Sequence, residues 1–156
     1  VDEAVFRSER ETGFKNRALA YLLKAHGLFK DAVEDVLECY FRACSIRVCS
    51  RDLAYIGMAL ANHGRKFKTE ERFFPAEYAR FVNAVLMICG MYDGSGEFAV
   101  RVGVPAKSGV GGGIMAVAPT RMGIGIYSPA LDEKGNSIAG IQALERLSRR
   151  MYLSIF

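Results

Sequence analysis

The stretch with the clearest chemical character is PAKSGVGGG, residues 105–113, where a lysine and a serine directly precede a glycine-rich run. Such residues occur in phosphate-binding loops and on strands beside a catalytic nucleophile. A P-loop needs glycines where this chain has Ala106 and Arg101. A dinucleotide fingerprint fails at Ile114 in one register, and in the other it ends at Ala116 but leads into a strand pattern. The remaining interpretation of these residues is a Lys-Ser-Gly strand beside a serine nucleophile. The alternative is an ordinary strand end.

Other residues with reactive side chains predict no further site. Four cysteines lie at spacings that do not bring three thiols onto one helix face: Cys39, Cys44, Cys49 and Cys89. We therefore expect no metal site, and we expect the cysteines to be small buried apolar residues in a reducing compartment. His26 and His63 each adjoin a glycine at an expected helix end, where they are predicted to cap carbonyl groups.

The elements that must position these residues begin with a series of helices. Ser8 and Glu11 have capping-box spacing, which predicts a helix start near Ser8. Further helices are expected over residues 16–27, 31–45, 50–62 and 75–90, where stop glycines, first-turn acids and Pro75 mark the ends. The region from about 8 to 96 is therefore predicted to be helical.

Beyond residue 96 the pattern favours strands and a last helix. GGIMAVAP and MGIGIYSP meet at Thr120 and Arg121, which predicts a β-hairpin, and a final helix is expected from about Ser137 towards Phe156. Alternate glycines on these strands leave one face bare for another backbone or a ligand. The order predicts an α+β fold. Its sheet is thin for so much apolar sequence, which indicates that strands are missing.

Composition limits the functional classes. The chain has 156 residues, 51% of them hydrophobic, and a formal net charge of +4. Scattered basic residues argue against nucleic-acid binding. The chain has no uninterrupted run of about 18 apolar residues, so no membrane span is predicted. The acidic start VDEAVFRSERE does not fit a signal peptide, and the chain begins without methionine, as a chain cut from a longer one does.

Several longer motifs together resemble one family. They are SERETGFKN (8–16), YFRACSI (40–46), GMALANHG (57–64), CGMYDGSGEFA (89–99), VGVPAKSGVGGGI (102–114) and SPALDEKGNSIAG (128–140). In order and spacing they resemble the serine-dependent glutaminases. The resemblance implies an αβα, β-lactamase/transpeptidase-like fold and hydrolysis of L-glutamine to L-glutamate and ammonia. It also implies a cytoplasmic homo-oligomer that needs neither a cofactor nor a metal.

The resemblance covers only the second half of that family's domain, so residues 1–156 are expected to be the C-terminal part of a single glutaminase domain. The family's nucleophile lies in a Ser-x-x-Lys motif, and no serine of this chain has a lysine three residues further on. An N-terminal half is therefore expected as a partner, and the chain alone is expected to be inactive. The alternatives are a non-catalytic half that only binds or assembles, and a β-lactamase-like amidase of other specificity.

The resemblance assigns substrate-binding roles to three residues of the helical region. Glu9 is expected to bind the substrate's α-ammonium, Asn16 its α-carboxylate end, and Tyr40 to contact it through its hydroxyl. Glu9 and Asn16 are seven residues apart, so both would face one side if the helix is continuous. The alternatives are a first-turn glutamate favoured by the helix dipole for Glu9, and a core position for Tyr40. This set suits a free amino acid rather than a peptide or a lactam.

The resemblance assigns the chemical step to three other residues. Tyr92 is expected to contact substrate and nucleophile and to carry a proton, which requires nearby positive charge because a free phenol titrates near about 10. The backbone N–H of Val110 is expected to form half of the oxyanion hole. Lys107, beside Ser108, is expected to add positive potential, with a strand-end lysine as its alternative.

Overall fold

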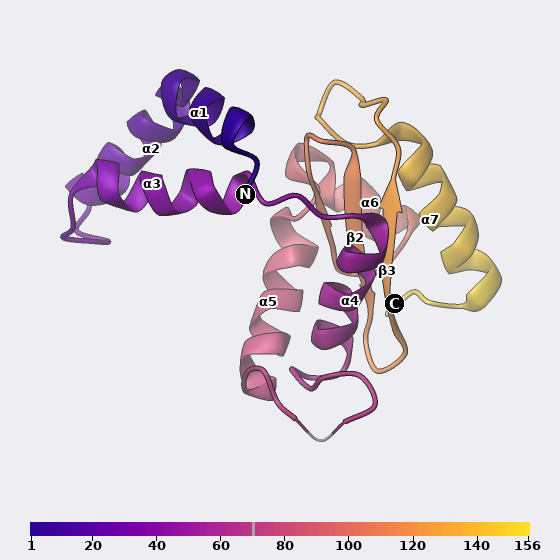
Figure 1. The fold of residues 1–156 in the computed structure, drawn as a ribbon. Coiled ribbons are helices and arrows are strands. Elements are labelled where there is room, and N and C mark those ends of the chain that lie inside the picture. Colours follow the sequence, from indigo (N-terminus) through magenta and orange to yellow (C-terminus); the bar gives the residue numbers. More distant parts are fainter. Residues whose placement is uncertain (70) are drawn as a thin grey trace. The chain divides into compact units, whose positions relative to one another are not determined.

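The computed structural model describes residues 1–69 and 71–156, which divide into two compact units, Val1–Arg47 and Val48–Phe156 (Figure 1). Each unit has its own hydrophobic core. Across the described ranges, no helix combines the length and apolar character that a membrane span requires.

The first unit consists of helices α1 (Glu3–Thr12), α2 (Phe14–Ala25) and α3 (Val33–Cys44). Helix α1 begins at Glu3 because Asp2 caps it: its Oδ1 accepts the N–H groups of Val5 at 3.1 Å and Ala4 at 3.0 Å. The bond from Val5 is the largest cause that lowers the pKa of Asp2. The predicted start near Ser8 is wrong, since Ser8 lies inside the helix.

A break at Gly13 separates α1 from α2. A Cβ on Gly13 would lie 2.5 Å from Cζ of Phe41, so only glycine lets the backbone approach this ring. Phe41 is fully buried in the core of the unit with Phe6, Ala20, Val33 and Leu37. Glu9 and Asn16 therefore lie on separate helices, so the condition under which both would face one side is not met.

The second unit contains a three-stranded antiparallel sheet in the order β1-β2-β3. Its elements are α4 (Ser50–Ala61), α5 (Ala76–Cys89), the 3-10 turn η1 (Tyr92–Gly94), α6 (Ser95–Arg101), β1 (Ala106–Ser108), β2 (Gly113–Ala118), β3 (Met122–Tyr127) and α7 (Ile138–Met151). The predicted hairpin is confirmed, with Thr120 at a φ of 63° in its turn. The last helix ends at Met151, earlier than predicted, because Tyr152 turns the chain at a left-handed φ of 51°.

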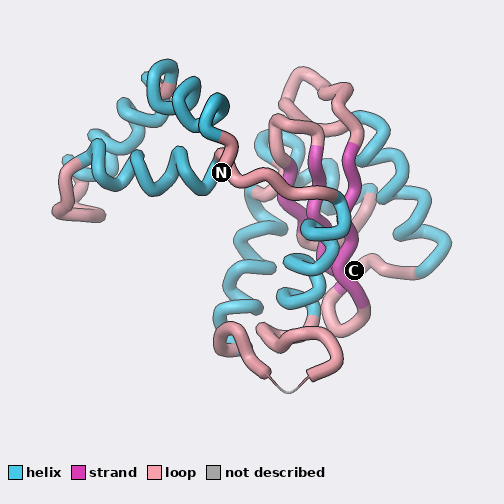
Figure 2. The backbone as a smooth tube through the Cα atoms, viewed as in Figure 1, coloured by secondary structure: helices cyan, strands magenta, loops and turns pink. Residues whose placement is uncertain are grey.

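Helices cover both faces of this sheet (Figure 2). Met115 and Val117 pack with residues of α4 and α5 on one face. On the other face Ile114, Ala116 and Ala118 pack with residues of α6 and α7. Successive side chains of a strand point to opposite faces, so β2 is buried on both sides. The predicted α+β fold with an αβα arrangement is confirmed in this unit.

Alternate glycines let α4 lie directly on β3. A Cβ on Gly123 would lie 2.0 Å from the backbone nitrogen of Met58, and one on Gly125 would lie 1.8 Å from the carbonyl oxygen of Ser50. The bare face expected from the glycine pattern therefore receives another backbone, that of a helix.

The cysteines do not occupy the core. All four are free and exposed, so the prediction of buried cysteines is wrong. Cys39 lies off the α3 stripe that buries Val33, Leu37 and Phe41, and Cys44 is the last residue of that helix. In the described part of the chain no group of three or more His, Cys, Asp or Glu residues could hold a metal ion.

Candidate functional site

Tyr92 and Lys107 come together in the second unit. Tyr92 opens the turn η1 just after α5, with a left-handed backbone φ of 51°. Lys107 projects from β1, and its Nζ lies 4.5 Å from the centroid of the Tyr92 ring. A cation over an aromatic face is attracted by the ring's quadrupole. The positive charge that the sequence argument required near Tyr92 is therefore present.

Val110 lies at the tip of the turn between β1 and β2. Two hydrogen bonds close this turn, from Gly112 N–H to Gly109 O and from Gly109 N–H to Gly113 O, each 2.9 Å long. The N–H of Val110 takes part in neither bond, and the residue is 71% exposed. The turn thus presents this donor at the surface.

Gly135 lies close to both Val110 and Tyr92. A Cβ on Gly135 would lie 3.7 Å from Cε2 of Tyr92 and 3.7 Å from Cγ1 of Val110. The three residues predicted for the chemical step, Tyr92, Lys107 and Val110, therefore meet in one cluster around the loop that carries Gly135. Residues 128–140 contributed only to the family resemblance, and no local signal marked Gly135 as a neighbour of Tyr92.

Ser108 contributes a buried hydroxyl beside this cluster. The residue is 1% exposed, and its N–H donates to the carbonyl of Gly90 at 2.9 Å. Its carbonyl accepts a hydrogen bond from the ammonium of Lys107. Its Oγ has no hydrogen-bond partner within the residues that the structure describes. Alternation along β1, which buries Ser108 and exposes Lys107, was the signal available in the sequence.

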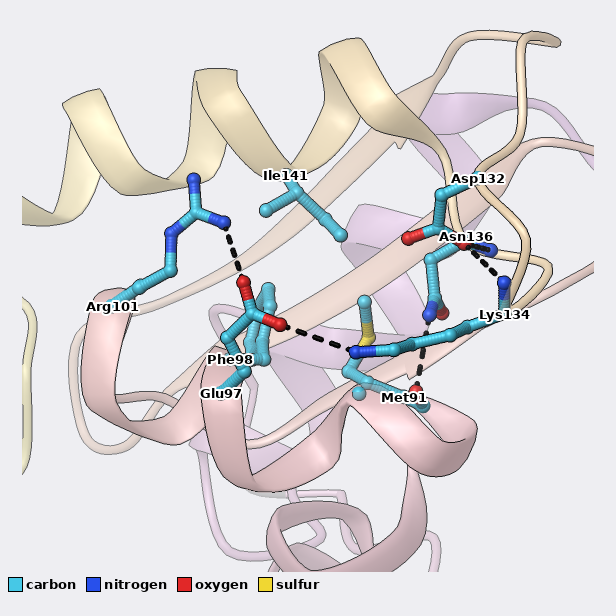
Figure 3. A pocket seen from close by; sticks show the side chains of 9 residues that line it. Met91, Glu97, Phe98, Arg101, Asp132, Lys134, Asn136 and Ile141 are labelled. Atoms are coloured by element: carbon cyan, nitrogen blue, oxygen red, sulfur yellow. Dashed lines mark hydrogen bonds and ion pairs between the residues drawn. The ribbon is translucent and has the colours of Figure 1, made fainter.

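Met91 and several charged side chains line a cavity of about 50 Å³ (Figure 3). Glu97 bonds to Arg101 at 3.0 Å and to Lys134 at 3.2 Å, and the bond to Arg101 is the main cause that lowers the pKa of this carboxyl. Ligand pockets usually measure about 300–1,000 Å³. This cavity has room for water but not for an amino-acid substrate.

The residues predicted to bind the substrate lie on three helices of the first unit. Glu9 is half-buried in the interior of α1, so the alternative of a first-turn glutamate is wrong. Asn16 is half-buried in the first turn of α2. Tyr40 on α3 is 49% exposed while its neighbour Phe41 fills the core, so the core alternative for Tyr40 is wrong as well.

The cluster of the second unit offers a phenol, an ammonium and a backbone donor, which can carry a proton and stabilise negative charge. An activated nucleophile is not among its described residues. Ser95 already uses its hydroxyl, which accepts from Met91 N–H at 3.0 Å and donates to Tyr92 O at 2.8 Å. No serine in the sequence has the Ser-x-x-Lys partner.

Comparison with known proteins identifies relatives over the whole chain. A family model described as Glutaminase matches residues 1–156. A glutaminase of Clostridium tetani is 56% identical over 156 residues, which are 100% of this chain and 51% of that protein. A glutaminase of Clostridioides difficile is 57% identical over 156 residues, 100% of this chain and 50% of that protein. The chain thus spans about half the length of these curated relatives.

Solved structures agree. A Bacillus subtilis glutaminase in covalent complex with 5-oxo-L-norleucine, formed by reaction with 6-diazo-5-oxo-L-norleucine, is 45% identical, with a TM-score of 0.95. The match covers 100% of this chain and 56% of that one. The expected β-lactamase-like fold is confirmed by this likeness.

Proposed function

The chain belongs to the glutaminase family, and we propose that it is the C-terminal part of a single glutaminase domain that hydrolyses L-glutamine to L-glutamate and ammonia. One observation carries the proposal: the cluster of Tyr92, Lys107 and Val110 has the groups for amide hydrolysis except the nucleophile. The chain alone is then inactive, and the missing Ser-x-x-Lys comes from an N-terminal half.

In the proposed reaction the serine oxygen of the N-terminal half attacks the side-chain amide carbon of glutamine. The carbonyl oxygen becomes an oxyanion, which accepts the N–H of Val110. Tyr92, whose oxygen has taken the proton of the attacking serine, delivers that proton to the departing nitrogen, the C–N bond breaks and ammonia leaves. Water then attacks the acyl-enzyme and gives a proton to the Tyr92 oxygen, which returns it to the serine as glutamate is released. The covalent complex of the Bacillus subtilis relative supports a covalent route.

The first unit supplies the proposed grip on the amino-acid end of glutamine. Glu9 would pair with the α-ammonium, Asn16 would donate to the α-carboxylate, and the hydroxyl of Tyr40 would contact the substrate. Charge-assisted hydrogen bonds of this kind are roughly twice as strong as neutral ones. Together the three favour a free amino acid as the substrate.

Within the described residues β3 pairs with β2 alone, and this open edge supports a partner half. Val117 N–H donates to Pro105 O, so Val117 and every second residue of β2 bond to β1. The residues between them bond to β3, and they lie opposite Met122, Ile124 and Ile126. The peptide groups of the intervening residues on β3 point away from β2, as on any edge strand. An unpaired edge is a template for a further strand.

An apolar stripe on α5 supports the same partner. Tyr78, Phe81, Val85 and Ile88 recur at helical spacing and are 57%, 70%, 38% and 76% exposed. A contiguous exposed apolar surface of this kind usually marks an interface. We propose that the N-terminal half pairs with β3 and covers this stripe.

Ammonia release tests the proposal, with each half alone and with the two halves mixed. Only the mixture should hydrolyse glutamine, because the serine and the Tyr92 cluster reside on different chains. Turnover by the 156-residue chain alone, at the rate of the mixture, would mean that the nucleophile has been misplaced. A stable mixture without turnover would instead favour a non-catalytic assembly.

Tyr92→Phe in the mixture tests the assignment of the chemical step. The variant should lower kcat far more than it raises KM, because the hydroxyl acts mainly in the transition state. An unchanged kcat with a raised KM would reduce Tyr92 to a substrate contact.

We further propose that the complete enzyme is a cytoplasmic homo-oligomer. Several large apolar side chains of α2 are exposed, among them Leu19, Tyr21, Leu22 and Leu23, which supports an interface between copies. The four exposed free thiols support a reducing compartment. Sedimentation of the mixed halves should give a mass above that of one pair, and Leu22→Glu should lower it.

A further inference from the structure

Tyr92 has a backbone conformation that an aromatic residue rarely adopts. Its φ is 51°, in the left-handed region, whereas that of the preceding Met91 is −109°. A bulky non-glycine residue in this region is an outlier, and such residues persist only where the surrounding structure over-determines them. The second unit should therefore contain groups that hold this turn.

Ser95 supplies the first of these groups. Its Oγ accepts the N–H of Met91 at 3.0 Å and donates to the carbonyl of Tyr92 at 2.8 Å. The side chain thus bridges the peptide group before Met91 and the peptide group after Tyr92, so its two bonds span both residues. Ser95 is 6% exposed, so water competes little for these bonds.

Asn136 supplies the second group, from a loop far along the chain (Figure 3). Its Nδ2 donates to the carbonyl of Met91 at 3.1 Å, and the same carbonyl accepts the N–H of Gly94 at 3.0 Å. The residue is 1% exposed. Asp132 fixes it in turn, because Asp132 Oδ1 accepts the N–H of Asn136 at 2.8 Å and the Asn136 carbonyl accepts the N–H of Asp132 at 2.8 Å.

We propose that Asn136 and Ser95 are positioning residues for Tyr92, which hold its backbone left-handed so that its ring stays close to Lys107 and to the Gly135 loop. The loop takes part directly, since Gly135 has a φ of 87° and a Cβ there would lie 3.7 Å from the ring. The inference rests on the proposed function, because it assigns the two residues to the proton transfer of Tyr92. Neither side chain needs to touch the substrate.

A double-mutant cycle in the mixture of halves tests the catalytic consequence. Asn136→Ala should lower kcat roughly tenfold, since small misplacements of a catalytic group are costly, and should leave KM within about twofold. In a Tyr92→Phe background the same change should cost less than about twofold, because the hydroxyl it positions is already gone. Equal losses in both backgrounds would overturn the proposal.

Ser148→Ala is the matched control. Ser148 is 4% exposed and donates to the carbonyl of Val102 at 2.6 Å, so it loses a comparable buried bond remote from the turn. The kcat of Ser148→Ala should stay within about twofold of that of the parent. Ser95→Thr, which keeps the hydroxyl, should retain more activity than Ser95→Ala. A loss in Ser148→Ala equal to that in Asn136→Ala would identify general destabilisation and overturn the proposal.

Hydrogen exchange of the 156-residue chain tests the positioning without catalysis. Asn136→Ala should speed exchange of the peptide that covers Met91 to Ser95 by roughly tenfold, and Ser148→Ala should not. Unchanged exchange in Asn136→Ala would overturn the proposal. Faster exchange in a protein that hydrolyses no glutamine when mixed would support the positioning and overturn the proposed function alone.

Discussion

Replacing Gly125 by alanine should separate α4 from the sheet. The added Cβ would lie 1.8 Å from Ser50 O and 2.8 Å from Ala54 N, both backbone atoms of α4. Ordinary contact begins at about 3.4 Å, so helix and strand must move apart by roughly 1.6 Å at this point. No side chain can rotate away to relieve the clash, because both neighbours are backbone.

The cost follows from the packing that this movement disrupts. Overpacking a well-packed core typically costs about 1–3 kcal/mol, and the backbone clash places Gly125→Ala at or above about 3 kcal/mol. The alanine itself is allowed at this φ, so the loss is steric. A domain has roughly 5–15 kcal/mol of stability, and such a loss would be a large part of it.

Gly96→Ala provides the control. Gly96 lies in α6, and a Cβ added there would have no described neighbour within 4 Å, so alanine should raise the free energy of unfolding by about 0.5 kcal/mol. Urea unfolding of the 156-residue chain, followed by far-ultraviolet circular dichroism, measures both variants. If the urea midpoints of Gly125→Ala and Gly96→Ala agree within error, the close approach of α4 and β3 is refuted.

Three further predictions concern single side chains. Ser108→Ala should leave the free energy of unfolding of the chain unchanged or raise it by up to about 1 kcal/mol in urea, because it removes a buried hydroxyl that has no partner among the described residues. In the mixed enzyme, Glu9→Gln should lower kcat/KM for glutamine by roughly thirtyfold, whereas Arg149→Gln should not; full activity of Glu9→Gln would remove its role. The bond from Arg101 holds the pKa of Glu145 below its ordinary value of 4.5, so the bonded carboxylate stabilises the fold above that pH and less as the pH falls through the folded pKa. Glu145→Gln should therefore flatten the acid limb of stability against pH, and an unchanged limb would refute the linkage.

Local signals in the sequence predicted much of the fold. The helix that starts after Pro75, the hairpin at Thr120 and the last helix after Ser137 were all located, because proline, turn residues and capping serines act within a few residues of themselves. The start of α1 was misplaced because Ser8 and Glu11 imitate a capping box, while Asp2 performs the capping.

Burial was predicted less well where it depends on which face of a helix meets the core. Cysteine is among the most often buried residues, yet Cys39 is exposed because α3 turns Val33, Leu37 and Phe41 inward. The break at Gly13 has the same origin, since it is the approach of Phe41 that requires a glycine there.

By itself the sequence determined the order of the elements, the family and the absence of a Ser-x-x-Lys motif, since each depends on residue types and their spacing along the chain. Only the tertiary structure decided that Tyr92, Lys107, Val110 and Gly135 meet, and that Asn136 holds the tyrosine's turn. These contacts join segments that local propensity cannot connect. They arise because β1 pairs with β2 and the loop before α7 folds back over the turn, so a packed sheet and its buried hydrogen bonds set the distances.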